Sequence, residues 1–197
     1  MSARLRTLFG LVFAAFALAG CGGSGPSFKN TDITGADYGR DFALTDHTGK
    51  TRTLADFRGK AVVMFFGYTR CPDVCPTTLA ELKAVKEQLG EDGKRLQVLF
   101  VTVDPERDTQ KLLASYVPAF DPSFLGLYGD SAATAKVAKD FRVFYQKSPG
   151  KTPDGYTVDH TAGSYVFDPQ GRLRLFVRHG NAANLAADVR ILLNASG

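Results

Sequence analysis

The sequence predicts an α/β fold in which a mixed central sheet is flanked by helices, and three observations support this. A continuous apolar run of β-forming residues at 61–68 and a second, mostly apolar stretch at 96–104 are typical of strands buried on both faces. Segments with helical spacing of apolar residues alternate with these runs, as in folds built on parallel strands. A hairpin pattern at residues 164–177, followed by a helical pattern at 182–193, adds antiparallel strands near the C-terminus.

The remaining elements follow in chain order. Residues 41–60 alternate apolar and polar side chains around a Thr-Gly turn, which predicts an N-terminal hairpin extension. The first helix is expected over 77–89 and is ended by glycines. Later elements are expected as a helix at 109–116, a strand at 124–129, a helix at 131–141 with Ser131 as N-cap, and a strand at 141–147. This order resembles the thioredoxin fold, lengthened by a strand–helix pair between residues 104 and 141.

The first 40 residues are expected to lie outside the folded domain, which is assigned to residues 41–197. Residues 1–20 have a basic start and an apolar run at 8–18, much shorter than the roughly 20 residues of a membrane-spanning helix, so they predict a secretory signal. Ala19 and Gly20 before Cys21 resemble a bacterial lipobox, which implies cleavage before Cys21 and diacylation of its thiol. Residues 21–40 then form a flexible tether. We expect a lipid-anchored domain on the extracytoplasmic, periplasmic face of a bacterial membrane.

Length and composition fit one globular domain. The chain has 197 residues, 44% of them hydrophobic and 11% aromatic, which is enough for a substantial core. The formal net charge of +4 falls when the signal is removed, because Arg4 and Arg6 leave with it and no acidic residue does. So small and dispersed a charge excludes nucleic acid as an expected partner. No long exposed apolar helix calls for a dimer, so we expect a monomer.

The stretch YTRCPDVCPT, residues 68–77, places Cys71 and Cys75 after the first buried strand, at the carboxyl end of the sheet where α/β folds bind ligands. Pro76 is expected as the first helical residue, with both sulfurs pointing outward and the helix N-terminus lowering the cysteine pKa. In a regular helix such a pair has Cβ atoms about 5–6 Å apart, wider than the about 3.5–4.5 Å of a disulfide. A disulfide, a redox switch and a site for a soft ion such as Cu(I) or Zn(II) all stay open.

A metal site would need a third ligand, and the chain has three histidines. His47 is expected as a solvated residue of the hairpin turn. His179 is expected in a surface or capping role. His160 lies in the loop before the penultimate strand, which faces the cysteine loop in a thioredoxin-like fold, so it is the candidate ligand.

Three segments in this order, FGYTRCPDVCPTTLAEL, VTVDPERDT and VDHTAGSYVFDPQGRL, resemble the Sco/SenC family of copper proteins that serve cytochrome c oxidase assembly. The resemblance covers roughly residues 41–193. It implies that Cys71, Cys75 and His160 bind one copper ion, as Cu(I) or Cu(II). Family proteins pass copper to the copper A centre of cytochrome c oxidase subunit II, the expected partner here unless another copper-receiving protein takes that place.

Other polar residues near these segments have two interpretations each. Asp159 either orients the His160 imidazole as a hydrogen-bond acceptor or is a loop aspartate. Asp73, between the cysteines, either adds negative charge near a cation or is a solvated turn residue. Asp104 and Pro105 are expected as a structural turn at the end of a strand.

Three functions remain compatible with the cysteine pair. The first is a copper chaperone, which is not an enzyme. The second is a thiol–disulfide oxidoreductase that reduces the copper A cysteines with Cys71 and Cys75 as its redox pair. The third is a peroxidase of the peroxiredoxin or glutathione-peroxidase type, which shares the fold but expects one reactive cysteine in a peroxide pocket.

Overall fold

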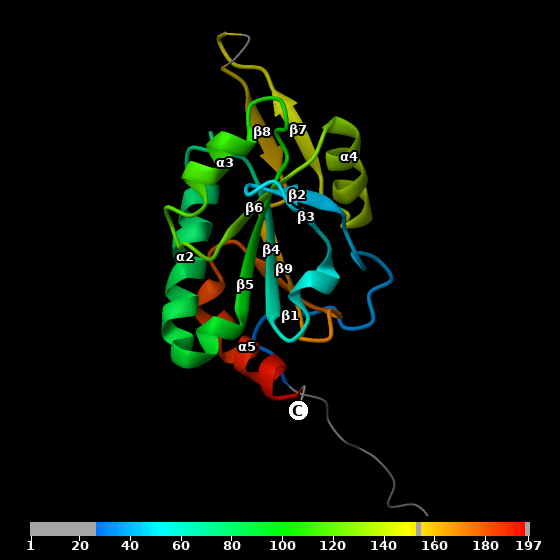
Figure 1. The fold of residues 1–197 in the computed structure, drawn as a ribbon, viewed down its shortest axis with the longest axis vertical. Helices are drawn as coiled ribbons and strands as arrows, with labels where there is room; N and C mark the ends of the chain where they lie inside the picture. Colours follow the sequence, from blue (N-terminus) through cyan, green and yellow to red (C-terminus); the bar gives the residue numbers. More distant parts are fainter. Residues whose placement is uncertain (1–26, 153–154, 196–197) are drawn as a thin grey trace, which may run out of the picture.

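The structure is a computed structural model that describes residues 27–152 and 155–195 (Figure 1). The predicted signal peptide and Cys21 lie outside the described residues. Ten strands are present in the described part of the chain, eight in a main sheet and two in a separate hairpin. The main sheet has the order β1 (Thr31–Asp32), β10 (Leu173–Arg178), β9 (Gly163–Phe167), β4 (Ala61–Gly67), β5 (Leu96–Thr102), β6 (Leu125–Tyr128), β2 (Leu44–Asp46), β3 (Thr51–Arg52).

The main sheet is mixed, as predicted. Strands β4, β5 and β6 run parallel to one another, whereas β9 pairs antiparallel with β4 and β2 pairs antiparallel with β6. Every residue of β4 and β5 is buried, which explains why these two strands are mostly apolar and do not alternate apolar with polar residues. The hairpin predicted between residues 41 and 60 is present as β2 and β3.

The main helices pack on the two faces of this sheet. They are α2 (Val74–Leu89), α3 (Gln110–Tyr116), α4 (Ser131–Asp140) and α5 (Leu185–Asn194), with 3-10 turns at Leu54–Phe57, Gly90–Arg95 and Ala182–Asn184. Helices α2 and α5 lie on one side of the central strands and α4 on the other (Figure 1). Consecutive residues of β4 point to opposite faces of the sheet. Phe65 packs against Phe100 of β5 on one face, whereas Phe66 packs against Phe141 at the end of α4 on the other. The architecture is the predicted α/β, thioredoxin-like fold.

The helix boundaries differ slightly from the predicted ones. Helix α2 begins at Val74, so Pro76 is its third residue rather than its first. Its missing N–H is still tolerated, because the first four amides of a helix have no intrahelical partner. The N-cap of α4 is Asp130, whose carboxylate accepts a hydrogen bond from the Ala133 amide at 2.7 Å, and not Ser131.

The strand predicted at 141–147 does not join the main sheet. It appears as β7 (Tyr145–Ser148), which pairs only with β8 (Thr157–His160) in a two-stranded antiparallel hairpin. The hairpin and α3 lie at one end of the domain, and β1 and α5 lie at the opposite end (Figure 1). Strand β8 was expected as a loop because only Val158 is apolar and buried in it.

The folded domain begins before residue 41, so the tether boundary predicted at residue 40 is wrong for the part described. Strand β1 pairs with β10. The carboxylate of Asp188 in α5, fully buried, accepts hydrogen bonds from the backbone amides of Lys29 and Asn30 at 2.8 and 2.9 Å and from the Asn30 side chain at 2.8 Å. These contacts fix the segment to the domain from about residue 28 on. No helix in the described ranges is long and apolar enough to cross a membrane.

Candidate metal centre

The cysteine loop, residues 68–73, connects the end of β4 to the start of α2. The amide of Cys71 donates to the carbonyl of Tyr68 at 3.2 Å, which closes a turn ahead of the helix. The Sγ atom of Cys71 then accepts a hydrogen bond from the amide of Cys75 at 3.4 Å. Asp73 occupies the N-cap position without capping the helix through its side chain. Cys71 therefore holds its sulfur at the N-terminus of α2 by taking one of the unpaired helix amides.

Cys75 is fully buried, so the expectation that both sulfurs point outward is correct only for Cys71, which is half-buried. Its sulfur lies above Gly67, where a Cβ atom would come within 2.7 Å of it. Burial raises the pKa of the Cys75 thiol far above its ordinary value, despite a hydrogen bond from the Tyr68 amide. The pKa of this residue is therefore raised and not lowered as predicted, because desolvation outweighs the hydrogen bond from the Tyr68 amide.

His160 is the last residue of β8, where it pairs with Tyr145 of β7. Its imidazole lies edge-on to the rings of Tyr68 and Phe65, with both pairs of centroids 6.0 Å apart. Burial lowers the pKa of His160, so the neutral imidazole is favoured. Nδ1 lies 3.1 Å from the carbonyl oxygen of Thr161. Because a carbonyl only accepts, Nδ1 carries the proton and Nε2 keeps its lone pair.

The three predicted site residues come together. The Nε2 atom of His160 lies 3.5 Å from the Sγ atom of Cys75 and, with Nδ1 protonated, accepts from its thiol. The ligand atoms of Cys71, Cys75 and His160 all lie within 4.8 Å of one another, and this is the group of potential metal ligands found in the described ranges. A hollow of about 340 Å³ opens onto Cys71 and His160 beside Tyr68. The arrangement offers one sulfur and one imidazole nitrogen at an open hollow, with the buried sulfur of Cys75 beside them.

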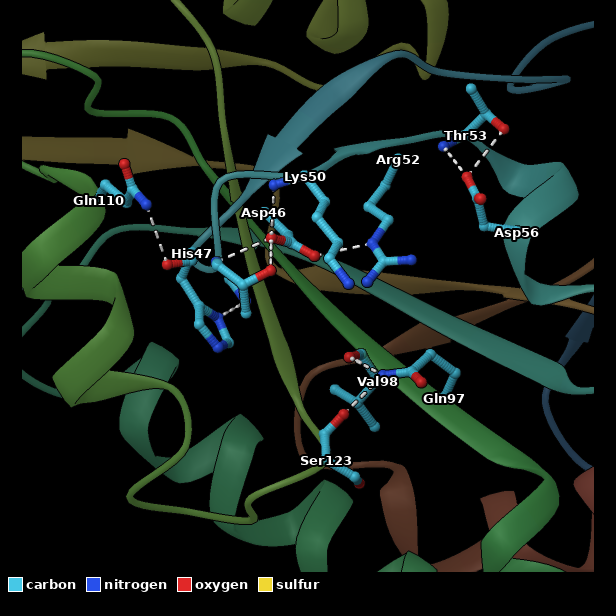
Figure 2. Close-up of polar contacts among 12 residues, drawn as sticks. Asp46, His47, Lys50, Arg52, Thr53, Asp56, Gln97, Val98, Gln110 and Ser123 are labelled. Atoms are coloured by element: carbon cyan, nitrogen blue, oxygen red, sulfur yellow. Dashed lines mark hydrogen bonds and ion pairs between the residues drawn. The ribbon is translucent and has the colours of Figure 1, made fainter.

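The other two histidines lie away from this cluster. His179 is exposed, as predicted, and its Nδ1 lies 3.0 Å from the hydroxyl of Thr78. His47 lies in the β2–β3 turn, as predicted, but it is half-buried rather than solvated. Its Nδ1 accepts a hydrogen bond from the Gly126 amide at 3.0 Å, and its carbonyl accepts one from Gln110 at 3.3 Å (Figure 2). His47 thus joins the turn to β6 and has no role in the cluster.

Of the two interpretations of Asp159, the contacts favour a structural residue of the hairpin over an acceptor for the His160 imidazole. Its carboxylate accepts a hydrogen bond from the hydroxyl of Ser148 at 2.6 Å, across the hairpin, while the backbone carbonyl of Thr161 takes the Nδ1 proton of His160. A backbone acceptor is invisible in a sequence pattern. Asp73 is an exposed turn residue whose carboxylate lies 3.5 Å from the Thr77 hydroxyl.

The turn at residues 104–108 was expected to be structural, but it touches both halves of the site. Asp104 is fully buried and pairs with Arg107 at 2.5 Å. Asp108 accepts hydrogen bonds from the amide and hydroxyl of Thr69 in the cysteine loop, at 3.0 and 2.6 Å. Sequence reasoning missed these contacts. The available signal was a run of charged residues directly after a buried strand, at the carboxyl end of the sheet.

Fold and site together define a thioredoxin-like domain with a Cys-Cys-His cluster at the carboxyl end of its central parallel strands. A sequence model of the family described as SCO1/SenC matches residues 30–194. The chain belongs to the SCO1/SenC family.

Several relatives show the same match. The chain is 42% identical over 150 residues to the bovine protein named "Protein SCO2 homolog, mitochondrial", covering 75% of this chain and 56% of that protein. It is 36% identical over 154 residues to the human "Protein SCO1 homolog, mitochondrial", covering 77% of this chain and 51% of the relative. The chain thus spans about half the length of these curated relatives.

Solved structures agree with the fold. The structure titled "Structure of Bradyrhizobium japonicum ScoI with copper bound" has a TM-score of 0.72 at 42% identity, covering 80% of this chain and 99% of that one. A copper-bound yeast Sco1 structure has a TM-score of 0.71 at 29% identity, covering 86% of this chain and 90% of the neighbour. The solution structure of apo Sco1 from Thermus thermophilus has a TM-score of 0.72 at 43% identity, covering 89% of this chain and all of that one.

Proposed function

We propose that the protein binds one copper ion through Cys71, Cys75 and His160 and delivers it to the copper A centre of cytochrome c oxidase subunit II. The observation that carries the proposal is the convergence of these three ligand atoms within 4.8 Å of one another. Relatives of this chain have been solved with copper bound, at 42% and 29% identity. The copper ion is the cargo of such a protein rather than a resident catalytic cofactor.

The chemistry of the ligands favours copper. Soft sulfur ligands together with imidazole select Cu(I) and Zn(II) among common ions, and three ligands of this kind suit the low coordination number of Cu(I). The neutral imidazole of His160 offers Nε2 without losing a proton, because Nδ1 is bonded to Thr161. The thiols must lose their protons when the ion binds, so ion binding and proton release are coupled.

The unequal burial of the cysteines favours transfer by ligand exchange. Cys75 is fully buried and Cys71 is half-buried at the edge of the hollow. An incoming ligand from an acceptor reaches the ion from the hollow and replaces Cys71 and His160 before Cys75. Copper then passes from one protein to the other without release into solvent.

The thiol–disulfide oxidoreductase is the rival function for the same cysteines. That function needs only the two sulfurs, whereas the structure also brings Nε2 of His160 to 3.5 Å from the Sγ atom of Cys75, where it offers a third ligand. This favours the chaperone. A peroxidase is disfavoured for a related reason, because Cys71 does not stand alone: the ligand atoms of Cys75 and His160 lie within 4.8 Å of its sulfur.

The decisive experiment compares His160→Ala with His179→Ala in cells that lack the protein. His179 is the matched control, since it is a histidine outside the cluster. A chaperone predicts that His160→Ala fails to restore copper A content and oxidase activity, that His179→Ala restores both, and that added copper restores part of the loss. Full restoration by His160→Ala would support the reductase, and unchanged copper A content in the deletion strain would contradict both functions.

We also propose that the domain is held by a lipid on Cys21 at the extracytoplasmic face of a bacterial membrane. The ordered N-terminal segment supports this, because β1 lies at the end of the domain opposite the β7–β8 hairpin (Figure 1). The candidate site would then face away from the membrane, toward an acceptor. Labelling with a radioactive fatty acid should mark the wild-type protein and not Cys21→Ser. Equal labelling of both proteins would contradict the anchor.

A further inference from the structure

The turn formed by residues 104–108, directly after β5, contacts the hairpin that carries His160. The hydroxyl of Tyr156 donates to the Asp104 carboxylate at 2.7 Å, and Nη1 of Arg107 donates to the Tyr156 carbonyl at 2.9 Å. The guanidinium of Arg107 also stacks on the Tyr156 ring, 3.5 Å from its centroid. Tyr156 directly precedes β8, so these contacts fix the hairpin at a residue only four positions before His160 along the chain.

The same turn contacts the segment that carries the cysteines. The Asp108 carboxylate, which is 1% exposed, accepts hydrogen bonds from the amide and hydroxyl of Thr69. Its other contact, from the Thr102 hydroxyl at 2.6 Å, fixes it to β5. The guanidinium of Arg107 also lies 5.8 Å from the centroid of the Tyr68 ring, which packs edge-on against His160. One turn therefore holds both halves of the Cys-Cys-His cluster.

The hairpin needs such a contact because β7 and β8 pair only with each other and not with the main sheet. An isolated two-stranded hairpin is at most marginally stable in water. Asp104 and Arg107 each make a hydrogen bond to Tyr156 in which one partner is charged, and such bonds are stronger than those between neutral groups. Both charged side chains are shielded from solvent: Asp104 is fully buried, and the Arg107 side chain is 9% exposed. Lys147 and Glu106 make an exposed pair in the same region, at 2.6 Å, which is expected to add little.

We propose that Asp104 and Arg107 are positioning residues that clamp the β7–β8 hairpin through Tyr156, and so hold His160 over the two sulfurs. These contacts determine how much His160, the third ligand, contributes to the affinity for copper. This inference rests on the proposed copper site. It differs from a purely structural role because the effect of the clamp on copper must pass through His160.

The test measures Cu(I) affinity by competition with a chelator for four proteins: wild type, Arg107→Ala, His160→Ala and the double variant. Residues that orient a metal ligand typically contribute about 10–100-fold to affinity. We expect Arg107→Ala to weaken Cu(I) binding by about that factor in the wild-type background. In the His160→Ala background, the same substitution should change the affinity less than about 3-fold, because Arg107 affects copper binding only by positioning the imidazole, which that variant lacks.

Two further variants refine the test. Glu106→Gln is the matched control, since it removes the exposed pair with Lys147 in the same turn and should keep wild-type affinity. Tyr156→Phe removes only the hydroxyl bonded to Asp104, and its Cu(I) affinity should fall between those of wild type and Arg107→Ala.

The Cu(II) charge-transfer spectrum of Arg107→Ala should shift toward that of His160→Ala. A change in fold alone would not produce this signature in a variant whose thermal midpoint stays close to wild type.

The proposal is overturned if Arg107→Ala keeps wild-type affinity, or if it weakens binding equally in both backgrounds. If the wild-type protein holds no copper, the proposed function fails, and the clamp is then judged on the apo-protein alone. Amide hydrogen exchange of β8 should be faster in Arg107→Ala and unchanged in Glu106→Gln. Equal protection of β8 in wild type and Arg107→Ala would refute the clamp itself.

Discussion

Gly67, the last residue of β4, supports the sulfur of Cys75 from below, so Gly67→Ala is a direct probe of the site. An added methyl would lie 2.7 Å from the Cys75 Sγ atom and 2.9 Å from the rings of Phe65 and Phe100. Carbon atoms in contact prefer separations of about 3.5–4.0 Å. Since all three contacts are too short, each of these neighbours, the sulfur included, must move away by about 1 Å. Since the two rings and the sulfur are fully buried, none of them can turn outward without cost.

The magnitude follows from this crowding. Overpacking of a well-packed core typically costs about 1–3 kcal/mol, and we expect a loss of that size in the free energy of unfolding of Gly67→Ala. The effect on copper should be larger than the effect on the fold, because metal–ligand distances tolerate only about 0.2 Å. A sulfur displaced by about 1 Å can no longer share the ion with Cys71 and His160 at normal distances. Cu(I) affinity is expected to fall at least about 10-fold.

The assay combines denaturant unfolding of the apo-protein with chelator competition for Cu(I). Gly126→Ala on β6 is the matched control, since its methyl would crowd Leu113 of α3 at 3.2 Å and Val117, which ends that helix, at 3.0 Å, away from the cluster. The control should lose stability and keep its Cu(I) affinity. Wild-type affinity in Gly67→Ala, or an equal loss of affinity in both variants, would refute the reasoning that ties Gly67 to the position of the sulfur.

Two further predictions concern the scaffold. Asp188→Ala removes the buried acceptor of the Asn30 amide and side chain, so we expect a loss of about 2 kcal/mol in unfolding free energy and faster amide exchange at Asn30; unchanged exchange there would contradict this account. Asp46 has a pKa lowered to about 2, because its hydrogen bonds from Thr48 and Arg52 outweigh the opposing effect of burial (Figure 2). Its stabilising contribution is therefore present above the ordinary pKa of 3.8 and lost as the pH falls toward 2, so the stability advantage of the wild type over Asp46→Asn should shrink across that window. An advantage that stays constant from pH 6 to about pH 2 would argue against the depressed pKa.

Much of the main sheet could be predicted because burial on both faces leaves a simple signature. The run at 61–68 is apolar throughout and the run at 96–104 is mostly apolar, and they became β4 and β5. Strand β8 could not be predicted in the same way, since three of its four residues are polar and its position depends on the contacts of Tyr156 with Asp104 and Arg107. The ordered segment before residue 41 was missed for a similar reason, because it is held by the side chain of Asp188, far away in the sequence.

The structure brings the three candidate ligands together, but their environments differ from those expected. Spacing and position could place Cys71, Cys75 and His160 at one end of the sheet. They could not show that Cys75 is fully buried, because its burial depends on Gly67, Phe100 and the other side chains packed beneath it. They offered the Asp159 side chain as one possible partner of the imidazole, whereas the acceptor is the backbone carbonyl of Thr161. Tertiary packing therefore decided the electrostatics of the site.

The most direct test of the copper site is X-ray absorption spectroscopy of the Cu(I)-loaded protein, at a measured copper stoichiometry, for wild type and His160→Ala. We predict one copper ion per chain with two sulfur neighbours and one nitrogen neighbour, and we predict that the nitrogen contribution is lost in His160→Ala while both sulfur contributions remain. A wild-type spectrum without nitrogen, or a nitrogen contribution that is unchanged in His160→Ala, would contradict a centre built from Cys71, Cys75 and His160.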